Sequence, residues 1–148
     1  MFQTHEEFAN ARQHLHLLQT KVEKMLTLLL LQFDLWNDDS ETEPSLAELL
    51  QLCEDFEALL EEHYSQVCGN GLLERAVTNH PSLGPVLRDV EKWQAAILRD
   101  LQGLIAELKT SPISAEQFTK YRDSMRLLQS EILAEEIQER HLMERGWT

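Results

Sequence analysis

Residues 8–36 read FANARQHLHLLQTKVEKMLTLLLLQFDLW, and the spacing of the apolar side chains in this stretch decides the fold. Apolar residues recur in alternating steps of three and four, with one gap at Gln32. They are Phe8, Ala11, Leu15, Leu18, Val22, Met25, Leu29 and Trp36. A stripe with this period forms one face of an amphipathic α-helix. The spacing therefore predicts a long helix over residues 4–36.

Three more segments carry the same periodicity, and we expect helices over residues 46–68, 84–109 and 115–144. Polar segments that contain proline or glycine separate the four helices. Ser45 and Ser114 are suited to cap the second and the last helix, and the glycines of residues 68–71 can adopt the left-handed conformation of a helix end. The pattern predicts an all-α fold, an up-down-up-down antiparallel four-helix bundle, in a single domain spanning residues 1–148.

The chain is strongly acidic. Thirteen Lys and Arg residues against 26 Asp and Glu residues give a formal net charge of −13. This charge disfavours nucleic acids and anionic membrane surfaces as partners, because both attract clustered positive charge. No secretory signal pattern or membrane-spanning run is visible, and Cys53 and Cys68 are too few for a disulfide framework. We therefore expect a cytoplasmic protein in which both cysteines are buried thiols.

A few polar residues fall where the helical period requires apolar ones. His63 lies on the stripe of the second helix, Glu135 and Glu139 continue the stripe of the last helix, and His14 flanks the stripe of the first. With a rise of about 1.5 Å per residue, all four lie roughly 8–15 Å from the same end of the predicted bundle. We expect His14, His63, Glu135 and Glu139 to share one layer near that end.

Two interpretations of this layer remain open. Histidine and carboxylate side chains on facing helices are the ligands with which bundles bind iron, zinc or manganese. The alternative is a hydrogen-bonded or solvated cluster that holds no metal. The other glutamate-rich segments, including residues 61–62 and 131–136, are expected on the outer face. Trp147 packs either on the bundle or on another subunit, which leaves a homodimer open.

The second helix and the loop after it resemble bacterial hemerythrin-like proteins. Residues 56–73 read FEALLEEHYSQVCGNGLL, followed by ERAV at residues 74–77 and PSL at residues 81–83. The pattern of that family is roughly F-x-x-L-x-x-H-F-x-x-E-E-x-G-G-Y-L, then an apolar turn and P-x-L. Residues 135–143, EEIQERHLM, resemble the last-helix pattern H-E-x-x-E-N-x-L-L. The similarity runs from about residue 56 to about residue 143.

Hemerythrin domains are four-helix bundles that hold a non-haem di-iron centre, bound by histidines and bridging carboxylates, and bind dioxygen. The resemblance implies that His63 takes the place of the second-helix ligand, that His14 or His16 supplies the first-helix histidine, and that Glu139 keeps a carboxylate. Other ligand positions depart from the family pattern: Val67 replaces a glutamate, Trp93-Gln94 replaces a Glu-His pair, and Glu135 replaces a histidine. The resemblance therefore supports the fold and implies a lost or reduced di-iron site.

Three functional hypotheses follow. Our main expectation is a non-catalytic binding or regulatory module for an unknown protein or small ligand, without a cofactor, because the sequence carries no nucleophile, phosphate-loop or paired zinc-cysteine motif. The second is an iron- or other metal-binding protein that senses oxygen or carries out redox chemistry. The third is a regulator that sequesters a transcription factor, since residues 69–77, GNGLLERAV, also resemble bundle proteins of the regulator-of-sigma-D kind and an acidic surface attracts a basic partner.

Overall fold

The computed structural model describes residues 5–38, 46–69, 71–110 and 115–147, and the regular structure in them is entirely helical. The elements are α1 (His5–Asp38), α2 (Leu46–Tyr64), a π-helical turn (Ser65–Gly69), α3 (Leu72–Asn79), a 3₁₀ turn (Pro81–Leu83), α4 (Gly84–Thr110) and α5 (Ala115–Gly146). The all-α expectation is confirmed, and the four long helices follow the predicted ranges closely. The proposed caps Ser45 and Ser114 lie outside the described residues. No described helix has both the length and the apolar character to cross a bilayer.

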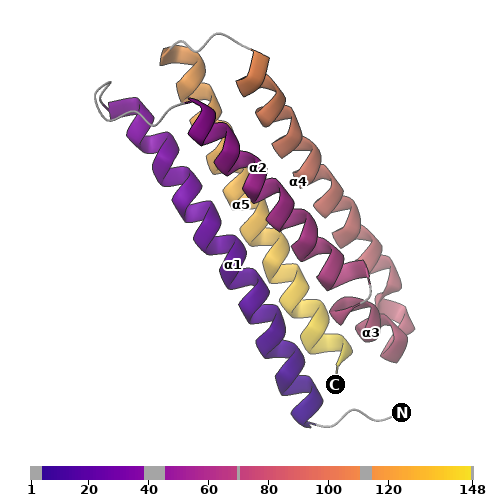
Figure 1. Ribbon diagram of the computed structural model, residues 1–148. Helices are drawn as coiled ribbons and strands as arrows, with labels where there is room; N and C mark the ends of the chain where they lie inside the picture. Colours follow the sequence, from indigo (N-terminus) through magenta and orange to yellow (C-terminus); the bar gives the residue numbers. More distant parts are fainter. Residues whose placement is uncertain (1–4, 39–45, 70, 111–114, 148) are drawn as a thin grey trace.

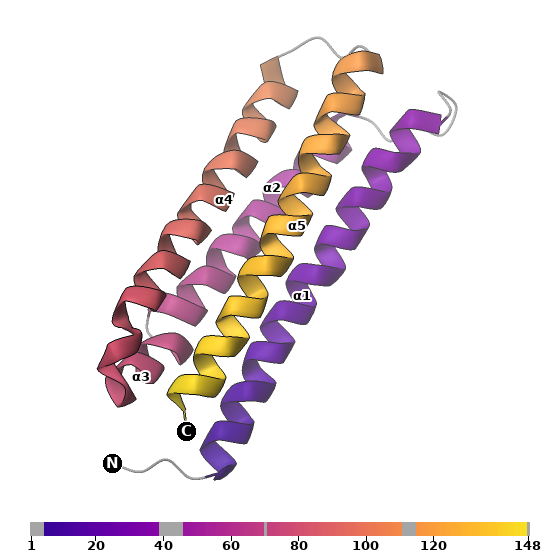
Figure 2. The same cartoon turned by 180° about the vertical axis from the view of Figure 1, so that it is seen from behind.

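The four long helices lie side by side (Figure 1). In that view residue numbers increase upward along α1 and α4 and downward along α2 and α5. Each of α1 and α4 contacts both α2 and α5, so the four helices form a ring around a shared interior. Figure 2, the view from behind, shows α5 between α4 and α1, with α2 on the far side.

The interior holds two apolar clusters that follow one another along the bundle. The larger cluster contains the fully buried Phe33, Phe56 and Leu101, and the smaller one lies at the α3 end. Along α1 the buried stripe passes through Leu26 and Phe33, not through the predicted Met25, which is half-buried. A straight helix drifts from a strict heptad because its period is 3.6 residues, and this drift brings Phe33 inward. The side chain of Trp36 lies outside the described residues.

The short helix α3 closes one end of the bundle beside the end of α5. Trp147 is buried there, and its indole Nε1 donates a hydrogen bond of 2.9 Å to the carbonyl oxygen of Leu72. The amide Nδ2 of Asn79 donates to the carbonyl oxygen of Gly146 at 3.0 Å. The Phe8 ring lies 6.5 Å from the Trp147 ring, measured between centroids. Trp147 therefore packs on its own chain.

Two glycines in this region are required by close approach of the backbone. The expectation of left-handed glycines is wrong for the described residues, none of which has a positive φ, and Gly71 has a φ of −138°. A Cβ at Gly71 would overlap the carbonyl oxygen of Gln66 in the π-helical turn, and a Cβ at Gly146 would overlap Ala76 of α3. Gly146 therefore allows α5 to touch the backbone of α3.

We predict that Gly146→Ala lowers the free energy of unfolding by about 1–3 kcal/mol, because the added methyl group forces α3 away from α5. Gly103 in α4 is the matched control, since a Cβ there meets no atom within 4 Å. Gly103→Ala should raise the free energy of unfolding by about 0.5–1 kcal/mol, because alanine loses less backbone entropy in a helix. Urea denaturation followed by circular dichroism measures both changes. Equal stability of the two variants would contradict the close contact.

Candidate metal centre

A layer of buried polar side chains crosses the interior between the two apolar clusters. Every long helix contributes to this polar layer, and no member is more than 4% exposed. Its members are Gln19 from α1, His63 from α2, Gln94 from α4, and Glu135, Glu136 and Glu139 from α5. Polar groups taken out of water cost free energy unless they find hydrogen-bond partners, so the members have to satisfy one another.

His63 and Glu139 form the shortest link between α2 and α5 in the polar layer. The imidazole Nε2 of His63 lies 2.9 Å from Oε1 and 3.1 Å from Oε2 of Glu139. An ionised carboxylate only accepts hydrogen bonds, so the imidazole N–H donates. The ring of Tyr64 stands edge-on to the imidazole, with 5.6 Å between ring centroids. The π-helical turn starts directly after these two residues, and turns of this kind often lie beside functional sites.

Gln19 connects the polar layer to α1 and to the surface. Its Nε2 donates to Oε1 of Glu139 and to the backbone oxygen of Glu136, both at 3.0 Å. Its Oε1 accepts a hydrogen bond of 2.8 Å from Nη1 of Arg140, which is exposed. Because a guanidinium only donates, Arg140 fixes the amide with its oxygen outward and its NH₂ group toward Glu139.

Gln94 connects α4 to the carboxyl groups of α5, as Gln19 does for α1. Its Nε2 donates to Oε2 of Glu135 at 2.9 Å and lies 3.5 Å from Oε2 of Glu139. Both glutamines therefore aim their NH₂ groups at carboxyl groups of α5. The other oxygen of Glu135, Oε1, is buried and receives no hydrogen bond from the described residues.

The two central carboxyl groups differ in protonation. Burial raises the pKa of Glu135 far above the ordinary range of a carboxyl group, and contact with Glu139 raises it further, against the effect of the Gln94 hydrogen bond. Burial also acts on Glu139, but hydrogen bonds from Glu135, His63 and Gln19 outweigh it and lower the pKa of Glu139 below its ordinary value. At neutral pH Glu135 therefore carries a proton and Glu139 is an ionised carboxylate.

Glu136 corrects the expectation that residues 131–136, apart from the stripe position Glu135, lie on the outer face. Its side chain is 1% exposed and lies near Glu23 of α1. Burial raises the pKa of Glu136 to about 9, and the charges of Glu139 and Glu23 add to this shift while Arg140 opposes it. The inward face of α5 is thus wider than the single stripe that the sequence indicated, because α5 packs against both of the long helices beside it, α1 and α4.

Three members of the polar layer converge in a way that suits one metal ion. His63, Glu135 and Glu139 each present one ligand atom, and these atoms all lie within 4.8 Å of one another. Two ligands of a tetrahedral ion lie roughly 3.4 Å apart when each bond is about 2.1 Å. The His63 Nε2 and Glu139 Oε1 atoms, which lie 2.9 Å apart, therefore have to separate slightly to admit the ion. Within the described part of the chain this is the one group of three or more His, Cys, Asp or Glu ligands.

The predicted ligand His14 does not join this group. It is exposed and lines a cleft of about 240 Å³ between α1 and α2, which His63 also reaches from the inside. The reason is its register, because His14 precedes the buried Leu15 by one residue and is rotated by about 100° from the stripe. The structure thus brings together His63, Glu135 and Glu139 but not His14. The residue that α1 contributes to the polar layer is Gln19.

Sequence reasoning missed the two glutamines of the polar layer. Gln94 lies four residues after Val90 and three before Ile97, which is the spacing of a position on the apolar stripe of this helix. Trp93 is only half-buried. A buried glutamine looks like an outer-face residue in a sequence, because its partners come from another helix. Two signals were available: Gln94 has the same spacing from apolar neighbours as the ligand-type residues, and Trp93-Gln94 stands where the hemerythrin pattern has a Glu-His pair.

Comparisons with known proteins found no match: no family model, curated protein or solved structure is similar to this chain. The interpretation of the polar layer therefore depends on its own geometry. That geometry consists of three converging ligand-type side chains, two glutamine amides that hold the carboxyl groups, and one arginine that connects the layer to the surface.

Proposed function

We propose that this chain is a non-catalytic, hemerythrin-like, up-down-up-down antiparallel four-helix bundle that serves as a binding or regulatory module in the cytoplasm. Its di-iron site is reduced to a centre for one divalent metal ion, with His63, Glu135 and Glu139 as ligands. The observation that carries the proposal is the convergence of these three buried side chains, from α2 and α5, within 4.8 Å.

The donor set fits one ion and does not fit two. A di-iron centre of the hemerythrin kind requires several imidazoles together with bridging carboxylates. The described polar layer offers one imidazole, and the facing positions on α1 and α4 hold Gln19 and Gln94. Both amides direct NH₂ groups at the carboxyl groups, and an NH₂ group that donates hydrogen bonds does not bind a cation.

Charge balance also favours a single divalent ion. At neutral pH the three ligand residues hold the negative charge of Glu139 and the proton of Glu135. When that proton leaves, two carboxylates neutralise a divalent cation, which removes the penalty of an unpaired buried charge. One imidazole and two carboxylates would suit zinc, iron(II) or manganese, and such an ion would supply Lewis acidity when bound.

The burial of the centre supports a binding role over a catalytic one. None of the three ligand side chains is more than 2% exposed, and apolar clusters lie on both sides along the bundle. A small ion can reach the centre when helices separate slightly, whereas an organic substrate in the cleft between α1 and α2 would meet only His63 and neither carboxyl group. We therefore propose that the metal ion stabilises the fold of the module and regulates its conformation, and that it does not catalyse a reaction.

We predict that the chain binds one zinc ion and that His63→Ala lowers this affinity at least about tenfold, because one of three ligands is lost. Isothermal titration with zinc measures affinity and stoichiometry. His14→Ala is the matched control, since it removes an exposed imidazole at the same end of the bundle and should leave binding unchanged. His63→Gln, which keeps a side chain able to donate to Glu139, serves as the second variant if His63→Ala unfolds. Two ions per chain, or equal affinity in the wild type and both His63 variants, would show that the ligand set is wrong.

Metal binding is expected to depend on pH with a definite sign. The raised pKa of Glu135 means that this group is protonated below and at neutral pH, so the metal has to displace its proton. Affinity for zinc should rise by about tenfold per pH unit for each displaced proton between about pH 6 and pH 8. Competition with a coloured zinc indicator at several pH values measures this slope. Glu135→Gln, which has no proton to release, should bind more weakly with a shallower slope, and a wild type without pH dependence would contradict the assignment.

A further inference from the structure

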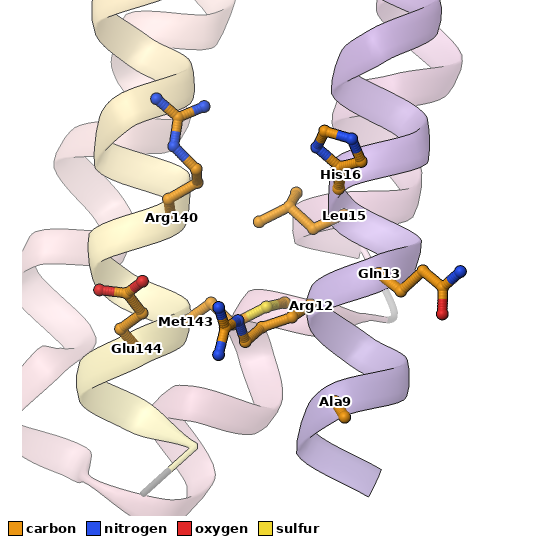
Figure 3. Close-up of a pocket in the computed structure, with 8 residues that line it drawn as sticks. All are labelled: Ala9, Arg12, Gln13, Leu15, His16, Arg140, Met143 and Glu144. Atoms are coloured by element: carbon orange, nitrogen blue, oxygen red, sulfur yellow. The ribbon is translucent and has the colours of Figure 1, made fainter. Parts of the chain in front are cut away.

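A groove of about 480 Å³ lies between α1 and α5, on the outer side of the polar layer (Figure 3). Figure 3 shows Leu15 of α1 and Met143 of α5 pointing into the space between the helices. Both side chains are almost fully buried, and together they form the apolar floor of the groove. Arg140 and His16 lie at the upper end of this view, and Arg12 reaches across the lower end.

The groove gathers basic side chains in an otherwise acidic chain. Three of its eight lining residues are basic, Arg12, His16 and Arg140, and one, Glu144, is acidic. In Figure 3 Glu144 lies at the lower end, near Arg12, and the upper end holds Arg140 and His16 without a carboxylate. Arg140 uses one N–H to bind Gln19 and has five in all, so the guanidinium keeps donors for a ligand.

We propose that this groove binds a small organic acid, a monocarboxylate with an apolar tail. The carboxylate pairs with Arg140 and His16, because the planar guanidinium fork matches the two oxygens of a carboxylate. The tail lies against the groove floor at Leu15 and Met143, where its own apolar surface leaves water. The apolar floor favours such an acid over an inorganic anion, and the basic end favours it over a neutral lipid.

The bound acid would share Arg140 with the polar layer. Nη1 of Arg140 donates to Gln19, and Gln19 donates to Glu139, the hydrogen-bond partner of His63. A carboxylate that draws Arg140 into the groove weakens its bond to Gln19, so the amide is held less firmly toward Glu139. Occupation of the groove therefore changes the contact between Glu139 and His63, and an external ligand is sensed in the interior.

The binding test uses octanoate and the full, metal-free chain, so its outcome does not depend on the metal proposal. Titration calorimetry should show one octanoate per chain, with acetate and 1-octanol each at least about tenfold weaker, since one lacks the tail and the other the charge. Arg140→Gln should weaken octanoate by about tenfold, the loss expected for a charge-assisted hydrogen bond. Arg145→Gln is the matched control, an exposed arginine of α5 outside the groove lining, and should leave binding unchanged.

His16→Leu is the second variant, because it removes part of the basic end without touching Gln19, and it should weaken octanoate several-fold. Absence of octanoate binding, acetate binding as tight as octanoate, or equal affinity of the Arg140→Gln and Arg145→Gln variants would overturn the proposal. The coupling has its own measurement, the imidazole resonances of His63 in ¹⁵N NMR spectra. Octanoate should shift them in the wild type but not in Gln19→Leu, which still binds octanoate. A wild type whose His63 resonances stay unchanged on saturation would refute the coupling.

Discussion

The interior of this bundle depends on the hydrogen bonds that the carboxylate of Glu139 accepts. It is fully buried and ionised, and a buried charge without donors would cost several kcal/mol. Glu135 of the same helix supplies one donor. The others come from Gln19 of α1 and His63 of α2, with Gln94 of α4 close by. Each donor reaches Glu139 only at one position along its helix. The carboxylate therefore ties α1, α2 and α4 to one register against α5.

The polar layer also explains why the core is divided into two apolar clusters. Buried apolar side chains gather in one cluster on each side of the layer, and α5 crosses it with three carboxyl groups within two turns. Two of these groups, Glu135 and Glu136, have raised pKa values and are protonated at neutral pH. The layer is thus acidic in composition but carries little charge, which is what a bundle interior tolerates. Most of the formal charge of −13 lies on the outer faces of the helices.

Among the described residues, the hydrogen bond between Arg140 and Gln19 connects the polar layer to the surface. Arg140 lies outside, Gln19 lies inside, and the 2.8 Å bond between them orients the amide toward Glu139. A binding module needs a link of this kind, because a ligand on the surface acts on a buried centre only through groups that both share. The same residues would carry information outward, from the proposed metal centre to the groove.

The sequence predicted the long helices and the inward-facing residues, but it did not predict which side chains are partners in the polar layer. Periodicity is a local property, so it located the long helices and showed that His63, Glu135 and Glu139 face inward. The side-chain partners are a property of packing. The rotation of α1 excluded His14 from the layer and admitted Gln19, and packing against two neighbours buried Glu136.

The sequence by itself therefore determined the helices and the three ligand-type residues, because apolar spacing and polar interruptions are written along the chain. Only the tertiary structure decided that Gln19 and Gln94 hold the carboxyl groups, that Arg140 orients Gln19, and that a groove forms beside them. These contacts join residues that are far apart along the chain. They exist only once the rotation and register of all four helices are set.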